Sequence, residues 1–182
     1  KNFTGFVFKI HANLDPRHRD RIAFLRICSG RFERNKLFHH VRLNKNIRFS
    51  SPASFLGQRK SIIDEAFPGD VIGLYDTGNF KIGDTLTEGE NLGFKGIPYF
   101  SPEMFRAARL RDPLKSKQLQ KGLQELGEEG AIQVFELEGG QMLLGAVGVL
   151  QFEIVAQRLK DEYKVDAVFE PADIHTARWL TF

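Results

Sequence analysis

The chain contains one cysteine, Cys28, among its 182 residues. A single cysteine excludes an internal disulfide bond and a metal centre built from several cysteines, and such sparing use is typical of a reducing compartment. Cys28 lies in an apolar run, and no electropositive pocket that would activate a thiol is evident around it. We therefore expect a buried, unreactive thiol.

Long apolar segments are missing as well. No run approaches the roughly 18 apolar residues that cross a bilayer, and residues 1–10 lack both the apolar core and the cleavage site of a secretory signal. These absences predict a cytoplasmic protein with no membrane partner. Because the chain opens on Lys1 rather than methionine and enters a strand-like pattern at once, we expect Lys1 to be a cut end within a longer protein.

Sequence motifs for catalysis are also absent. No GxxxxGK[ST] loop accompanies the DxxG pattern at Asp70–Gly73, which we expect to form a turn and a strand. Gly145–Gly148 lacks the lysine and third glycine of a phosphate cradle, and close packing of a strand against a helix explains it better. The adjacent His39 and His40 would point to opposite faces of a strand, so we expect surface residues rather than metal ligands. The sequence predicts no catalytic, cofactor or metal site in this chain.

Positive charge is concentrated in the first third of the chain. Residues 1–60 hold fourteen Lys or Arg residues against three acids, a formal charge of +11, which leaves −8 for the other 122 residues. A basic first part beside an acidic remainder favours a polyanionic partner for the first part, with nucleic acid as the main candidate.

Short apolar or alternating runs separated by glycines fill the first half, a pattern typical of a small all-β barrel or sandwich. We expect strands at 5–10, 22–27, 37–43, 47–49, 71–75 and 85–86. Residues 93–102 are rich in glycine and proline, and we place the domain boundary near Gly96, giving domains 1–95 and 96–182.

The second half alternates strand and helix patterns. Leu119, Leu123 and Leu126 follow a helical period, as do apolar residues from Phe152 to Tyr163. We expect strands at 104–110, 131–137, 142–147 and 165–169, with helices at 114–128 and from Gly148 to 163. The order β-α-β-β-α-β predicts a ferredoxin-like α+β domain with both helices on one face of an antiparallel sheet.

Basic residues recur near the ends of the expected strands, in the groups Arg17–Arg21, Arg31–Lys36 and Arg42–Arg48. Asp15-Pro16 opens the first group as a loop. Alternate hairpin ends gather at one rim of a barrel, so two of these groups could face one phosphate backbone. The alternative is a set of solvated hairpins whose cations keep the sheet edge soluble.

These features resemble a known family. Asp15-Pro16, Arg21–Arg26 and Ser29-Gly30 are similar to the D-P…R-x-x-F-x-R-x-x-S-G signature in the second domain of translational GTPases. Their third domain is similar to segments 145–153, 158–160 and 163–165. Further segments resemble bacterial class II peptide chain release factors: 17–21, 66–70, 96–98, 101–106, 110–115 and 177–179. Asn35 stands where the family usually has glycine, and asparagine tolerates a left-handed turn.

The resemblance implies a six-stranded type of antiparallel β barrel followed by the ferredoxin-like domain. Both would form the middle of a GTPase whose GTP- and magnesium-binding domain precedes Lys1 and whose third domain continues past Phe182. Such a factor enters the ribosome after peptide release and ejects the class I release factor. An elongation-type or ribosome-associated GTPase would share both domains, whereas a small-molecule enzyme would need a pocket with converging titratable groups.

The resemblance also implies where the partners bind. The barrel would dock on small-subunit ribosomal RNA and the second domain on a small-subunit ribosomal protein, while the class I release factor would be reached indirectly. RNA contact is carried over to Arg17, His18, Arg19 and Arg21, and charge adds Arg42 and Lys45.

Overall fold

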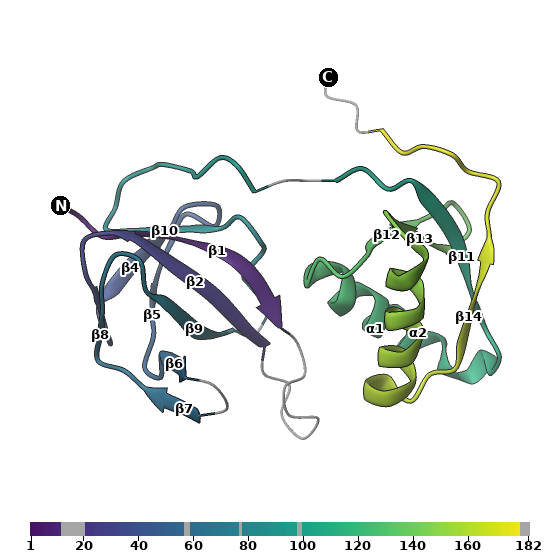
Figure 1. The fold of residues 1–182 in the computed structure, drawn as a ribbon, viewed down its shortest axis with the longest axis horizontal. Helices are drawn as coiled ribbons and strands as arrows, with labels where there is room; N and C mark the ends of the chain where they lie inside the picture. The colour runs from purple at the N-terminus through teal and green to yellow at the C-terminus, as the bar shows by residue number, and fades with distance from the viewer. Residues whose placement is uncertain (12–20, 57–58, 77, 98–99, 179–182) are drawn as a thin grey trace. The chain divides into compact units, whose positions relative to one another are not determined.

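The computed structural model describes residues 1–11, 21–56, 59–76, 78–97 and 100–178. The chain divides into two compact units, Lys1–Ile97 and Pro98–Phe182 (Figure 1). In the part of the chain that is described, no helix is long and apolar enough to cross a membrane.

The first unit is a curled, eight-stranded antiparallel sheet with strand order β5-β4-β10-β1-β2-β9-β6-β7 (Figure 1). Its strands are β1 (Thr4–His11), β2 (Arg21–Ser29), β4 (Leu37–His40), β5 (Lys45–Arg48), β6 (Ala53–Leu56), β7 (Arg59–Ile62), β9 (Val71–Asp76) and β10 (Thr85–Thr87). A separate two-stranded sheet pairs β3 (Phe32–Glu33) with β8 (Glu65–Ala66). The predicted all-β, barrel-type first unit is confirmed, and its larger sheet is a curled half-barrel.

The strand count exceeds the expected six. The sequence does not predict β3, β6, β7 or β8, because two of them are two residues long and the other two lack a clear apolar alternation. The single run expected at 37–43 is divided into β4 and a turn in which Asn44 adopts a left-handed φ of 50°. Asn35 likewise has a φ of 63°, the conformation for which asparagine is well suited.

Phenylalanine rings form much of the core of this unit. Phe32 stacks on Phe38 with ring centroids 4.9 Å apart, and Phe3 packs against Phe38 at 4.5 Å. Phe49 and Phe80 extend the cluster, with their centroids 6.0 Å apart. Buried aromatic pairs of this kind add to the stabilisation that comes from removing apolar area from water.

Cys28 lies on the outer face of β2, and its side chain is exposed. The predicted burial is therefore wrong. Ala23, Leu25 and Ile27 alternate into the core, and the period of two along a strand sends Cys28 to the opposite side. Partial burial still raises the pKa of the Cys28 thiol, an effect that the nearby Arg26 opposes.

The second unit has a four-stranded antiparallel sheet with order β12-β13-β11-β14. Its elements are β11 (Met104–Leu110), a 3-10 turn (Pro113–Lys115), α1 (Ser116–Glu128), β12 (Gln133–Glu136), β13 (Met142–Ala146), α2 (Val149–Tyr163) and β14 (Ala167–Pro171). This order confirms the predicted ferredoxin-like domain. Pro171 is accommodated because β14 is an edge strand.

Both helices bury one apolar stripe against the sheet. Leu119, Leu123 and Leu126 of α1 lie in one hydrophobic cluster with Phe152, Val155 and Leu159 of α2. α2 ends at Lys164, whose φ of 58° is left-handed and whose backbone N–H donates to Leu159 O. Buried Val165 is thus part of the helix end, and the last strand begins at Ala167 rather than at the expected Val165.

Candidate nucleic-acid interface

Three of the residues predicted to contact RNA, Arg17, His18 and Arg19, lie outside the described residues. The other three are Arg21, Arg42 and Lys45. The structure does not bring these three together as one exposed basic cluster, because two of them are engaged with groups of the first unit.

Arg21 is 6% exposed at the start of β2. Its Nη2 donates to the backbone oxygen of Phe80 at 3.0 Å, and its Nε lies 3.9 Å from Oδ2 of Asp76. The same carboxylate accepts hydrogen bonds from the backbone N–H groups of Asn79 and Phe80, at 2.8 and 2.9 Å. Because its guanidinium is enclosed, we assign Arg21 to holding the loop after β9 rather than to RNA contact.

Arg42 donates two hydrogen bonds to Asp84, from Nε to Oδ1 at 2.6 Å and from Nη2 to Oδ2 at 2.8 Å. The same Nη2 donates to the backbone oxygen of Asn79 at 2.6 Å. The Arg42 side chain is 38% exposed, whereas that of Asp84 is buried. Nε and Nη2 of Arg42 are thus engaged within the first unit, which gives Arg42 a structural role.

His40 is fully buried, which contradicts its predicted surface position. Its Nδ1 accepts a hydrogen bond from the backbone N–H of Leu43 at 3.3 Å, so Nε2 carries the hydrogen and faces Oδ2 of Asp84 at 3.1 Å. The neighbouring His39 points to the other face and lies 3.3 Å from Oδ1 of Asn46. The opposite orientation of the two histidines is therefore confirmed, but only His39 is near the surface.

Asp84 lies at the centre of this group. Burial pushes the pKa of its carboxyl group upward, but hydrogen bonds from Arg42, His40 and the backbone N–H of Lys81 outweigh that effect and bring the pKa to about 2. The carboxylate is therefore ionised at neutral pH, and it joins the end of β4 to the turn before β10.

Lys45 is exposed at the start of β5, which is an edge strand of the sheet. Arg48, at the other end of the same strand, is exposed too. Three residue steps along the extended strand separate the two residues by about 10 Å. The two side chains give this edge a positive charge, a feature that can meet phosphates and that also discourages edge-to-edge pairing.

The middle basic group, Arg31–Lys36, is largely balanced by acids. The ion pairs are Arg31 with Glu33 and Glu65 at 3.2 Å, Arg34 with Asp64 at 3.2 Å, and Lys36 with Glu33 at 3.1 Å and Glu88 at 2.6 Å. The high positive charge of residues 1–60 therefore overstates what a polyanion would meet, since part of it is neutralised within the unit.

The two glycine motifs have structural roles. Asp70 accepts a hydrogen bond from the backbone N–H of Phe67 at 2.7 Å and lies directly before the strand β9, so the predicted turn and strand are confirmed. Gly145 packs against Pro102, not against α2, because an added Cβ would lie 2.7 Å from Pro102 Cγ. At the start of α2, the N–H of Gly148 donates to the side-chain oxygen of Gln151 at 3.1 Å. The Gln151 side chain therefore occupies the place where a phosphate would accept that hydrogen bond.

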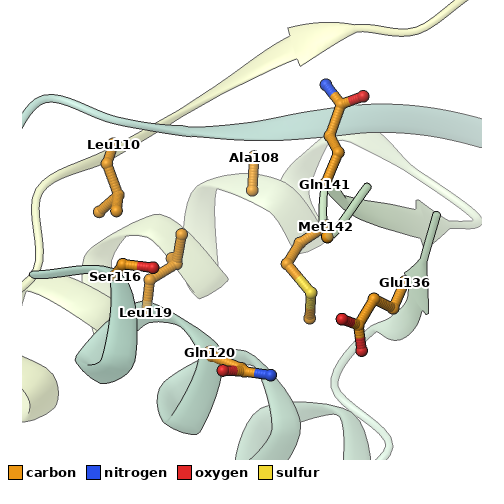
Figure 2. A pocket seen from close by; sticks show the side chains of 9 residues that line it. Ala108, Leu110, Ser116, Leu119, Gln120, Glu136, Gln141 and Met142 are labelled. Atoms are coloured by element: carbon orange, nitrogen blue, oxygen red, sulfur yellow. The ribbon is translucent and has the colours of Figure 1, made fainter. Parts of the chain in front are cut away.

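A pocket of about 320 Å³ lies in the second unit, beside the start of α1 (Figure 2). Its lining residues are Ala108, Leu110, Ser116, Leu119, Gln120, Glu136, Gly140, Gln141 and Met142. Glu136 is the one ionisable side chain among these nine, so the pocket does not bring together the titratable groups that acid–base or nucleophilic catalysis uses. Among the described residues, no group of three His, Cys, Asp or Glu side chains is placed to hold a metal ion.

Comparisons with known proteins extend over almost the whole chain. Residues 94–182 match the family model described as class II release factor RF3, C-terminal domain, and residues 2–89 match that of elongation factor G domain 2. The peptide chain release factor 3 of Aromatoleum aromaticum (strain DSM 19018 / LMG 30748 / EbN1) is 68% identical over 180 residues, which are 99% of this chain and 33% of that protein.

A crystal structure of a protein from Thermus thermophilus has the same fold, with a TM-score of 0.79 and 22% sequence identity. The match covers 93% of this chain and 26% of that one. The chain spans about a third of the length of the curated relative that it matches. From its two domain matches and its identity to that relative, the chain belongs to the peptide chain release factor 3 family.

Proposed function

We propose that this chain is the ribosome-binding part of a translation termination factor that promotes GTP-dependent dissociation of class I release factors. The observation that carries the proposal is the 68% identity, over 99% of the chain, to a peptide chain release factor 3. GTP and magnesium would be bound, and GTP hydrolysed, by a domain of the longer protein outside these residues. The chain's own task is to bind and to transmit the nucleotide state, in the cytoplasm.

The two units would have different partners on the ribosome. The first unit would meet small-subunit ribosomal RNA through exposed cations, and the second would meet a small-subunit ribosomal protein. The class I release factor would be displaced indirectly. Of the residues expected to contact RNA, we retain Arg17, His18, Arg19 and Lys45 and add Arg48, because Arg21 and Arg42 are engaged within the first unit.

An elongation-type factor is the second candidate, supported by the match of residues 2–89 to elongation factor G domain 2. The match of residues 94–182 to the release-factor C-terminal domain favours termination.

An experiment with the longer factor that contains this chain distinguishes termination from elongation. With ribosomes that have released their peptide, GTP should accelerate the loss of a labelled class I release factor, and GDP should not. Movement of transfer RNA on the ribosome without any loss of the release factor would support the elongation function and refute the proposal.

A further inference from the structure

Aromatic rings lie at the surface of the first unit, on the outer face of β1, β2 and β6. Phe8 is 38% exposed and Phe55 is 37% exposed, while Phe6 and Phe24 are half-buried. Phe6 and Phe8 have ring centroids 6.4 Å apart, and Phe24 and Phe55 have centroids 5.3 Å apart. β1, β2 and β9 are neighbours in the sheet and β6 follows β9, so the rings span four strands (Figure 1).

A β-bulge explains the exposure of Phe8. The pairing of β1 with β2 shifts register between Val7, opposite Leu25, and Lys9, opposite Phe24. The extra residue, Phe8, has no partner in the ladder, and both Phe8 and Lys9 are exposed while Val7 remains in the core. Bulges re-aim side chains in this way and are common beside binding sites.

Gly73 explains how Phe55 reaches its neighbour. Gly73 in β9 lies opposite Phe24 in β2, and a Cβ on Gly73 would lie 2.5 Å from Cε2 of Phe55. The ring of Phe55 therefore occupies the space above a residue that has no side chain. Any larger residue at position 73 would push Phe55 away from Phe24.

The exposed charged residues within the described parts of these four strands are cations. Lys9 and Arg26 are both exposed, and Arg26 lies opposite Phe6 in the ladder. β1, β2, β9 and β6 contain one acid, Asp76, which is buried and accepts hydrogen bonds from the loop that follows β9. Exposed rings interleaved with cations, and without an exposed acid, complement a partner that has flat bases and negative phosphates.

We infer that this face, formed by Phe6, Phe8, Phe24 and Phe55 with Lys9 and Arg26, binds unpaired nucleotides of RNA. The rings of Phe8 and Phe55 stack on exposed bases, and the two cations contact the flanking phosphates, as on other aromatic sheet surfaces that bind single strands. The inference rests on the proposed function, in which the first unit meets RNA. The inference goes beyond the proposed function because binding to this face requires unpaired bases, whereas the β5 edge can contact the phosphates of any RNA, single- or double-stranded.

The test compares two probes of equal phosphate number, a single-stranded oligoadenylate of about 12 nucleotides and an abasic strand of the same length. Fluorescence anisotropy with the 182-residue chain should show tighter binding of the oligoadenylate. Phe8→Leu, which keeps an apolar side chain but removes the flat ring, should weaken oligoadenylate binding by about fivefold or more and leave abasic binding unchanged. Phe8→Tyr should restore it. Phe100→Leu, at an exposed ring in the second unit, is the matched control.

Equal affinity for the two probes, with a steep salt dependence, would overturn the inference while leaving phosphate binding by the first unit intact. If neither probe binds, both base binding by this face and phosphate binding by the first unit are refuted. Unchanged oligoadenylate binding by Phe8→Leu, together with protection of this face from hydroxyl radicals in the longer factor, would assign it to a protein contact and also overturn the inference.

Discussion

Arg42 and Asp84 form a bidentate ion pair, with hydrogen bonds of 2.6 and 2.8 Å, on a carboxylate that is 3% exposed. His40 approaches the same carboxylate from within the core. Asp84→Asn should lower the free energy of unfolding by about 2 kcal/mol, because it leaves Arg42 and His40 without their anion. Urea denaturation measures the change. Arg31→Ala, which removes exposed ion pairs, is the control and should cost less than about 1 kcal/mol. Equal losses in the two variants would contradict a special role for Asp84.

The same carboxylate predicts a pH dependence. Its pKa is about 2 in the folded chain against an ordinary value of 3.8, so its contribution is fully present above about pH 4 and is lost as the pH falls towards 2. The loss amounts to about 2 kcal/mol. Urea midpoints recorded at decreasing pH should therefore converge for the wild type and Asp84→Asn. Parallel declines across that range would show that Asp84 does not titrate as described.

Gly73→Ala should destabilise the first unit by about 1 kcal/mol and displace Phe55, because the added Cβ lies 2.5 Å from that ring. The cost should shrink when Phe55 is also changed to Ala, since the clash then disappears. Gly93→Ala is the matched control, as nothing lies within 4 Å of its added Cβ. Thermal denaturation of the single and double variants measures the coupling. Additive costs would mean that Phe55 does not lie over Gly73.

In the second unit, Arg158 joins the two helices by donating hydrogen bonds to Glu129 and to Glu162. The Glu129 carboxylate raises the pKa of Arg158 further above its ordinary value. Arg158→Met keeps the aliphatic stem but removes the guanidinium that donates to both the Glu129 and the Glu162 carboxylates, so we expect a loss of about 2 kcal/mol in urea denaturation. Arg109→Ala at an exposed ion pair with Glu170 should cost under about 1 kcal/mol. An unchanged free energy of unfolding in Arg158→Met would show that Arg158 does not stabilise the packing of the two helices.

Local patterns predict the second unit better than the first. The bounds of β11 follow from apolar residues between Pro102 and Asp112-Pro113, and the buried face of α1 follows from Leu119, Leu123 and Leu126. β7 pairs with the adjacent β6, and β6 joins the sheet through β9, where Ala53 lies opposite Gly73; the residues of β6 and β7 show no local pattern that indicates this pairing. Burial of His40 depends on Asp84, far along the chain, so no local pattern indicates it.

The candidate site is only partly predictable for the same reason. Positive charge in the sequence indicates where cations are, but not which of them are paired. Arg21 and Arg42 look equivalent to Lys45 until Asp76 and Asp84 are placed beside them. The outer aromatic face depends on a bulge at Phe8 and on the crossing of Phe55 over Gly73, both of which are properties of strand pairing.

Binding of the 182-residue chain to isolated small ribosomal subunits across a salt series tests the central claim most directly. Phosphate contact by the first unit predicts affinity that falls steeply with salt, and Lys45→Ala with Arg48→Ala should reduce the log–log slope by about two. Lys117→Ala with Lys160→Ala removes equal charge from exposed positions of the second unit and should leave the slope unchanged. Binding with no salt dependence, or a slope that Lys45→Ala with Arg48→Ala does not alter, would contradict ribosomal RNA contact by this edge of the first unit.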